Sequence, residues 1–373
     1  MRDNAMRRRG FLGALGAVGL SVAAQPTGVA AGSGRSPGLL TLIGSYTSAD
    51  PAGRGLEVAH RGPGGALHPG GVVDGVPDAS FFAWSPDHRF VYVTNERPAG
   101  TVTAVDVSAH RPVVLGSVST RGAGPTHLTV HPDGDFLLTA NYTDGTVVVH
   151  RRRADGTLGE STDLVQHPGA QPHAHQVVVD PSGRWVIAVD LGADAVFCYR
   201  LDPGTGRLAR HQHLALPTGT GPRHLVFHPD ATRAYLLAEL ASTITVLHFD
   251  VDTGRFTPGE VLSTRDEDAT GENFPAEIAI SRDARFVYAS NRGDDTLAAF
   301  AVRDDHLEPL GGTPTGGSWP RHFTFDPEQT SLYVANQRSG TITRLRRDPG
   351  TGALTSTSDR YDCPSVAALT FHG

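Results

Sequence analysis

Histidine, arginine and glutamate side chains recur at one position of a repeated sequence pattern. Alignment of the repeats gives seven equivalent pairs, namely Ser80-Phe81, Thr126-His127, His175-Gln176, Arg223-His224, Ala276-Glu277, Arg321-His322 and Ser365-Val366. Such polar groups are costly to bury without partners. Imidazole and carboxylate groups can carry protons, and a guanidinium can hold an anion or a developing oxyanion. We therefore expect these side chains to meet in one concave site for a small molecule.

A second polar set follows the first along the chain. Its members are Asn95-Glu96, Asn141-Tyr142, Asp190-Leu191, Glu239-Leu240, Asn291-Arg292 and Asn336-Gln337. If the two sets lie on successive antiparallel strands, both reach the same face. Arg223 and Glu239 straddle a turn at 228–232 almost symmetrically, which predicts that they lie side by side. The same near-symmetry about a turn predicts that Arg292 lies beside Ala276 and that Gln337 lies beside Arg321.

The elements that must position these residues are short strands in a repeat. Residues 125–150 read PTHLTVHPDGDFLLTANYTDGTVVVH, and residues 222–249 repeat this order of apolar runs and turns. The aligned anchors are Ala79, Pro125, Ala174, Pro222, Pro275 and Pro320, at steps of 46, 49, 48, 53 and 45 residues. A period of about 40–50 residues with several short strands is typical of a β-propeller.

The strand count predicts seven blades in one all-β domain at residues 39–373. Six repeat units are complete, whereas the run from Pro364 to Phe371 supplies a single strand. We expect this strand to join N-terminal strands at 39–46 and 56–61 in one shared blade, because such closure removes the last open sheet edge. A six-bladed ring with a frayed end and a pair of β-sandwiches are the structural alternatives. The Gly-His and Trp-Asp marks of WD40 blades are absent.

Composition excludes several classes of function. The net charge is -7 and the arginines are scattered among acids, so we expect no nucleic-acid partner. The sequence contains no lysine, which excludes Schiff-base catalysis and a lysine-dependent phosphate loop. The two cysteines, Cys198 and Cys363, fall in blades that are far apart, so we expect two free thiols.

The first residues differ from the rest of the chain. Arg8 to Leu12 reads Arg-Arg-Gly-Phe-Leu and precedes a mildly apolar stretch that ends near Ala24. This pattern predicts a twin-arginine export signal at 1–31, cleaved after Ala24 or, preferably, after Ala31, with a linker at 32–38. The apolar run of about 14 residues is shorter than the roughly 20 that a spanning helix needs. We expect an exported protein without a membrane anchor after cleavage, as a monomer or simple homo-oligomer.

Structural interpretations compete with the functional ones. Arg223 and Glu239 could form an ion pair that only ties two strands. His127, His224 and His322 could be satisfied by backbone carbonyls, and the asparagines at strand ends could bond neighbouring backbone. The shared position of so many polar groups is what favours a site.

Six linked motifs give this sequence a family resemblance over residues 39–371. They are Pro172-His173-Ala174-His175, Gly221-Pro222-Arg223-His224, Glu239-Leu240, Pro275-Ala276-Glu277-Ile278, Asn291-Arg292-Gly293 and Pro320-Arg321-His322-Phe323. In these motifs the chain resembles the seven-bladed propeller lactonases, which include the propeller type of 6-phosphogluconolactonase and the fungal 3-carboxy-cis,cis-muconate lactonizing enzyme. Ala238 and Ala79 depart from the family pattern, which often has Asn and Pro there.

The resemblance implies a lactonase without an obligatory metal or cofactor. By analogy with the muconate enzyme, it implies that the catalytic residues are His175, Arg223, Glu239 and Arg292, with His175 or Glu239 as the base. The other polar residues at the mouth are then candidates for substrate binding, namely His127, His173, His224, Glu277, Arg321 and His322. The expected partner is a small lactone or an anionic carbohydrate, and export favours a substrate other than cytosolic 6-phosphogluconolactone.

Three other functions stay open at this point. A non-catalytic propeller could bind an anionic carbohydrate or carboxylate at the same mouth. A muconate-type lactonizing isomerase would close a ring instead of opening one. A calcium-dependent lactonase would need carboxylate and amide oxygens around the ion, and Arg223 and Arg321 would repel it.

Overall fold

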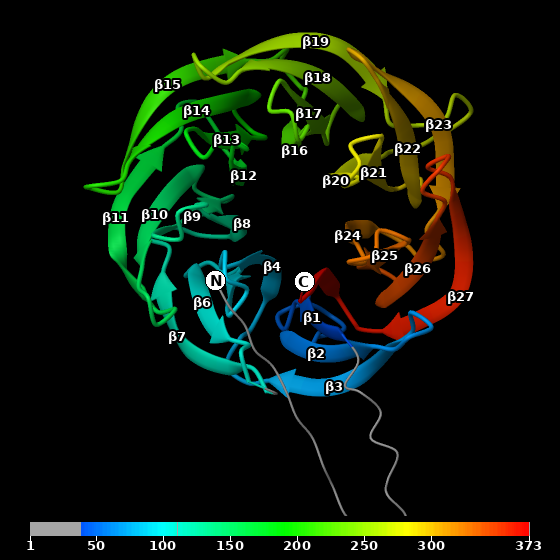
Figure 1. Cartoon of the computed structure of the whole chain (residues 1–373), viewed down its shortest axis with the longest axis horizontal. Helices are drawn as coiled ribbons and strands as arrows, with labels where there is room; N and C mark the ends of the chain where they lie inside the picture. Colours follow the sequence, from blue (N-terminus) through cyan, green and yellow to red (C-terminus); the bar gives the residue numbers. More distant parts are fainter. Residues whose placement is uncertain (1–38, 110, 373) are drawn as a thin grey trace, which may run out of the picture. The chain divides into compact units, whose positions relative to one another are not determined.

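A ring of antiparallel sheets accounts for all the regular structure in the computed structural model, which describes residues 39–109 and 111–372. Twenty-eight strands form seven four-stranded sheets around a central axis (Figure 1). We label these blades A to G. This architecture confirms the predicted seven-bladed, all-β propeller. The expected signal at 1–31 and linker at 32–38 lie outside the described residues.

Each blade runs from an inner strand at the axis to an outer strand at the rim (Figure 1). Blade A contains β28 (Val366–Phe371), β1 (Leu39–Ser45), β2 (Leu56–Arg61) and β3 (Leu67–Val73). Blade B contains β4 (Ala79–Trp84), β5 (Phe90–Asn95), β6 (Thr101–Asp106) and β7 (Val113–Ser119). Blade C contains β8 (Pro125–Val130), β9 (Phe136–Asn141), β10 (Thr146–Arg152) and β11 (Leu158–Gln166). Blade D contains β12 (Ala174–Val179), β13 (Val186–Asp190), β14 (Ala195–Asp202) and β15 (Arg207–Ala215).

The remaining three blades follow the same order. Blade E contains β16 (Pro222–Phe227), β17 (Arg233–Ala238), β18 (Thr243–Asp250) and β19 (Arg255–Ser263). Blade F contains β20 (Phe274–Ile280), β21 (Phe286–Arg292), β22 (Thr296–Arg303) and β23 (His306–Pro314). Blade G contains β24 (Pro320–Phe325), β25 (Ser331–Asn336), β26 (Thr341–Arg347) and β27 (Leu354–Asp362).

Blade A closes the ring by joining the two ends of the propeller chain. Strand β28 pairs antiparallel with β1, from Thr41 opposite Phe371 to Ser45 opposite Val366, as the neighbouring red and blue arrows show (Figure 1). This confirms the predicted shared blade, to which β3 adds a strand that the sequence analysis did not name. The closure gives blade A the same four strands as the other six blades.

The apolar core lies between neighbouring blades. The second strands, such as β5 and β9, are buried along their whole length because a blade packs on each of their faces. The outer strands, such as β15, alternate between exposed and half-buried residues. Cys198 and Cys363 are both buried and free, as predicted. No helix of the described residues is long and apolar enough to cross a membrane.

The closing strand makes a testable contribution to stability. Leu369 on β28 is fully buried against Ile43 and Tyr333, so Leu369→Ala should lower the free energy of unfolding by about 2–5 kcal/mol. Leu310→Ala, at an exposed leucine on β23, serves as the control and should change it by less than about 0.5 kcal/mol. Equilibrium guanidinium denaturation measures both. Equal effects of the two substitutions would show that the fold does not depend on this closure.

Candidate active site

Every inner strand starts with a β-bulge. The antiparallel register with the second strand shifts by one residue near the start of the inner strand in all seven blades, after its first residue in six of them and after its second residue, Pro275, in blade F. In blade E, for example, Pro222 lies opposite Ala238 and His224 lies opposite Leu237, so that Arg223 is the extra residue. His175, Arg321 and Thr126 hold the same place in their blades.

The bulges bring consecutive side chains to the same side of a strand. Successive residues of a regular strand point to opposite faces. Here, a small axial cavity is lined by both members of three consecutive pairs, and its lining residues are Ser80, Phe81, Thr126, Arg223, His224, Glu277, Arg321, His322 and Ala367. A bulge can redirect a side chain in this way, and bulges are frequent beside active sites.

A carboxylate shared by two guanidiniums forms the first polar cluster of the mouth. Glu239 Oε2 lies 3.0 Å from Arg223 Nε and 2.6 Å from Arg292 Nη2. Arg223 also donates to the Ala276 carbonyl, and Arg292 Nε donates to the Phe274 carbonyl at 2.8 Å. The side chain of Arg223 is only 3% exposed and that of Glu239 is 18% exposed, so the cluster opens to solvent on the side of Glu239.

A second carboxylate–guanidinium cluster lies at the same mouth. Glu96 Oε2 accepts a hydrogen bond from Tyr46 at 2.7 Å and lies 3.4 Å from Arg321 Nη2. The Arg321 guanidinium is 5.5 Å from the Tyr46 ring centroid. Tyr46 was missed by the sequence analysis. It directly follows β1, as Glu96 follows β5, so the aligned ends of the second strands carried the signal that could have found it.

Four imidazoles and a carboxyl group lie close together beside the arginines. His224 Nδ1 is 3.0 Å from Glu277 Oε1, and His322 Nε2 is 3.6 Å from Glu277 Oε2. The His224 ring centroid lies 5.0 Å from that of His175 and 5.3 Å from that of His127. These four histidines and Glu277 come from blades C, D, E, F and G, so the structure brings the predicted residues together.

Burial governs the protonation of this deep layer. Desolvation and the nearby Arg223 hold the pKa values of His175 and His224 well below the ordinary value, and desolvation does the same to His127. Burial lowers the pKa of His322 to about 4 and raises that of the Glu277 carboxyl. All four imidazoles are therefore neutral at pH 7.

The arginine cluster stays cationic at neutral pH. Burial, together with the neighbouring Arg292, lowers the pKa of Arg223 to about 9, although the charge of Glu239 acts to raise this pKa. Burial also lowers the pKa of Arg292. The mouth thus presents guanidinium charges beside neutral imidazoles, an arrangement that can bind an anion or an oxyanion while leaving a nitrogen free to accept a proton.

His173 lies beside the cluster and not within it. Its ring stacks on Tyr142 with 4.5 Å between centroids, and its Nδ1 lies 3.0 Å from the Tyr142 carbonyl oxygen. Tyr142 also meets His175 edge to face at 5.6 Å. His173 therefore supports the wall next to His175.

Three register expectations were wrong by two residues, and one of them concerns Gln337, which pairs with Trp319 instead of lying beside Arg321. In blade A, Val366 lies opposite Ser45 and Ala368 lies opposite Gly44, so Ala367 is the bulged residue equivalent to Arg223, and the predicted pair Ser365-Val366 precedes it. Arg292 lies opposite Phe274 instead of beside Ala276. The alignment of the anchor residues could not show these shifts, because it was based on the prolines. In addition, each bulge adds one residue that has no partner on the second strand.

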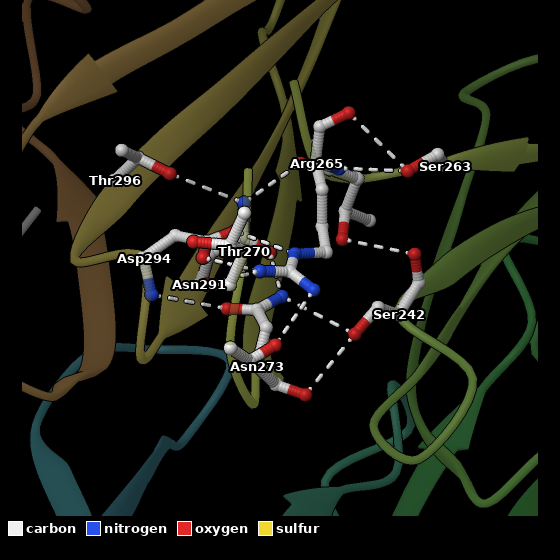
Figure 2. A network of polar contacts seen from close by, with 10 residues as sticks. Ser242, Ser263, Arg265, Thr270, Asn273, Asn291, Asp294 and Thr296 are labelled. Atoms are coloured by element: carbon white, nitrogen blue, oxygen red, sulfur yellow. Dashed lines mark hydrogen bonds and ion pairs between the residues drawn. The ribbon is translucent and has the colours of Figure 1, made fainter. Parts of the chain in front are cut away.

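A hydrogen-bonded network joins residues that flank Arg292 along the chain. Figure 2 shows the Arg265 guanidinium facing Asp294, with two hydrogen bonds of 2.8 Å. Asn273 Nδ2 donates to Asn291 Oδ1 at 3.0 Å and to Ser242 Oγ at 3.2 Å (Figure 2). These contacts fix the segment before β20 to the end of β21. The strand-end Asn291 thus bonds neighbouring groups, as its structural interpretation predicts.

The side chains that could contact a ligand at the mouth of the site include three cationic guanidiniums. Within residues 39–109 and 111–372, no three or more His, Cys, Asp and Glu side chains are grouped so that they could hold a metal ion. Arg223, Arg292 and Arg321 would repel a divalent cation placed among them. The arrangement is suited to an anionic ligand.

Comparisons with known proteins agree with the fold. The model of a family described as "Lactonase, 7-bladed beta-propeller" matches residues 40–371. An uncharacterized protein of Lactococcus lactis subsp. cremoris is 37% identical over 279 residues, which cover 72% of this chain and 81% of the relative. A Bacillus subtilis protein named 6-phosphogluconolactonase is 33% identical over 259 residues, 67% of this chain and 74% of that protein.

A solved structure shows the same similarity in three dimensions. The structure of a periplasmic gluconolactonase from Pseudomonas aeruginosa matches with a TM-score of 0.85 and 30% sequence identity. The match covers 89% of this chain and 98% of that chain.

The neutral buried histidines predict how stability depends on pH. Histidine in an unfolded chain titrates near pH 6.5, so below that pH the unfolded state binds more protons than the folded state. The free energy of unfolding should therefore fall between about pH 6.5 and 5, by up to about 1.4 kcal/mol per pH unit for each such histidine. Denaturation curves across this range measure the slope.

One substitution isolates the contribution of a single imidazole. His127→Gln should reduce the slope of the unfolding free energy against pH by the contribution of about one proton. His68→Gln, at an exposed histidine on β3, should leave this slope unchanged. An unaltered slope in the His127 variant would show that this imidazole is protonated in the folded protein.

Proposed function

The chain belongs to the seven-bladed β-propeller lactonase family, and from this premise we propose that it hydrolyses the lactone of a sugar acid or another carboxylic acid at the mouth described above. The observation that carries the proposal is the shared carboxylate of Glu239 between Arg223 and Arg292, next to neutral imidazoles. Lactone hydrolysis needs a group that accepts a proton from water and a positive group at the carbonyl oxygen.

His175 is the better candidate for the base. Its Nδ1 is buried without a hydrogen-bond partner among the described residues, and burial keeps the ring neutral, so one ring nitrogen is unprotonated. Glu239, the other candidate, has one carboxylate oxygen held by both guanidiniums. That contact suits Glu239 to orient Arg223 and Arg292.

The proposed reaction can be written with these groups. A water molecule attacks the lactone carbonyl carbon while His175 takes one of its protons. Arg223 and Arg292 stabilise the negative charge that forms on the carbonyl oxygen. When the intermediate collapses, the bond between the carbonyl carbon and the ring oxygen breaks, and the imidazolium returns its proton to that oxygen. The product is an open-chain hydroxy acid, which ionises at neutral pH.

The charge of the mouth favours a substrate without a phosphate group. The guanidiniums of Arg223, Arg292 and Arg321 carry three positive charges, and Glu96 and Glu239 carry two negative ones. The two clusters together carry a net charge of one, which suits the single negative charge of an oxyanion or of a carboxylate product. The name of the periplasmic gluconolactonase points in the same direction. We therefore propose an unphosphorylated sugar-acid lactone as the substrate.

We also propose that the protein acts outside the cytoplasm. The twin-arginine pattern of residues 8–12 supports this proposal, as does the similarity to a periplasmic enzyme. Fractionation of cells that express the full-length chain tests it, because retention in the cytoplasm would contradict export.

Removal of the proposed base or of the central guanidinium tests the reaction. His175→Gln and Arg223→Ala should each lower kcat/KM for glucono-δ-lactone by at least about 10²-fold, and EDTA should leave the wild-type rate unchanged. His150→Gln and Arg347→Ala, at buried residues that bond Ser119 and Tyr288 away from the mouth, are the matched controls. Their rates should stay close to that of the wild type. A pH-stat assay at neutral pH measures all five proteins.

The result separates the enzyme from a binding protein. Wild-type rates in both site variants would contradict the assigned roles. If wild-type protein turns over no lactone but binds gluconate in calorimetry, the mouth belongs to a non-catalytic propeller.

A comparison of substrates tests the charge argument. The wild type should show a lower KM for glucono-δ-lactone than for its 6-phosphate. Glu96→Gln removes one negative charge and should lower the KM for the phosphate ester at least severalfold, with little change for the neutral lactone. A lower KM for the phosphate ester in the wild type would contradict the proposed substrate.

A further inference from the structure

A chain of contacts runs from Arg223 down the axis of the propeller. Arg223 Nη1 lies 3.4 Å from His224 Nε2, and a guanidinium nitrogen can only donate. His224 Nε2 is therefore the acceptor, so in the neutral ring Nδ1 carries the proton. Nδ1 donates this proton to Glu277 Oε1 at 3.0 Å. The contacts thus determine one tautomer of His224.

Glu277 is itself held firmly in place. Its Oε1 also accepts the Ile278 N–H at 3.0 Å, and its own N–H donates to Ser290 Oγ at 3.0 Å. The residue is 93% buried, since only 7% of its surface is exposed. Glu277 Oε1 holds His224 and the backbone of Ile278, which suits a supporting role better than the substrate contact expected from the sequence.

The second carboxyl oxygen of Glu277 has no partner among the described residues. Oε2 is buried without a hydrogen bond, and the nearest imidazole nitrogen, His322 Nε2, is 3.6 Å away. Glu277 lines the axial cavity together with Arg223 and Arg321, which bring N–H donors to it. The cavity volume of about 10 Å³ is close to the minimum that one water molecule needs, and a buried water needs about 2–4 polar partners.

We propose that one water molecule occupies this cavity on Glu277 Oε2, and that Glu277 is a positioning residue that fixes the tautomer of His224 and thereby the guanidinium of Arg223. Without the carboxyl acceptor, the proton of His224 moves to Nε2 in part of the molecules. Two N–H groups then face each other at His224 and Arg223. Arg223 turns away from the position in which it contacts Glu239.

This inference rests on the proposed hydrolase function for its effect on rate, but its structural part can be tested separately. Glu277→Gln keeps an acceptor for His224 and a polar group at the water, so kcat/KM should stay within about fivefold of the wild type. Glu277→Ala removes both groups and should lower kcat/KM by at least about tenfold. Formate, which can occupy the space left by the carboxyl group, should restore part of the lost activity.

A tautomer measurement supplies the readout that a merely structural role would not change. Nitrogen-15 NMR of histidine-labelled protein distinguishes Nδ1–H from Nε2–H, and the His224 signal is identified by its loss in His224→Gln. We expect Nδ1–H in the wild type and in Glu277→Gln, and a mixture in Glu277→Ala. The paired control is Glu57→Ala, because Glu57 is also buried but bonds Tyr361 and Cys363 elsewhere in the ring.

Each outcome decides the proposal. If Glu277→Gln loses as much activity as Glu277→Ala while keeping the Nδ1–H tautomer, the carboxyl group acts through its own proton and the positioning role is overturned. An Nε2–H tautomer in the wild type also overturns it. If no lactone is hydrolysed by the wild type but the tautomer changes as expected, the proposed function fails and the contact chain stands. Should Glu277→Ala not fold, Glu277→Gln and the wild-type tautomer still decide.

Discussion

The β-bulge at the start of each inner strand is the constraint on which the site depends. A regular strand would turn His224 away from the cavity if Arg223 pointed into it. The extra residue in the register allows both side chains to line the same cavity, and it does the same for Arg321 and His322. The bulge repeats around the ring, and in blades B, E and G it brings two consecutive residues to the cavity. The density of polar groups there follows from this backbone feature.

Such density has an energetic cost, which the pairing of charges reduces. Guanidiniums buried near one another repel, and desolvation weakens each of them further. Glu239 compensates both Arg223 and Arg292, and Glu96 compensates Arg321. The histidines avoid the problem by staying neutral. The site thus contains strong positive charge only where a carboxylate is close. The positive charge that the carboxylates do not compensate is left to act on a ligand at the open mouth.

The repeat, the blade number and the closure by the two chain ends could all be predicted, because they depend on periodic apolar runs and on turns. Hairpin symmetry predicted the contact between Arg223 and Glu239, although Glu239 pairs with Gly221 in the hairpin and meets Arg223 through its side chain. The shift from Ser365-Val366 to Ala367 in blade A, and the pairing of Arg292 with Phe274, could not be predicted, since a bulge leaves no mark in the pattern of apolar residues. Tyr46 was missed for a different reason, because blade A is assembled from two distant segments and its second strand was not aligned with the others.

The chemistry arises from the way in which the blades differ. All seven backbones present equivalent positions, yet blade A supplies Ala367 where blade E supplies Arg223. The small side chain leaves room beside Glu277 and Arg321 for the axial cavity. A ring with an arginine in each blade would bring seven charges together and could not be neutralised by the two mouth carboxylates. The alanine is therefore as necessary to this site as the arginines, because it limits the charge and keeps the space that a water molecule requires.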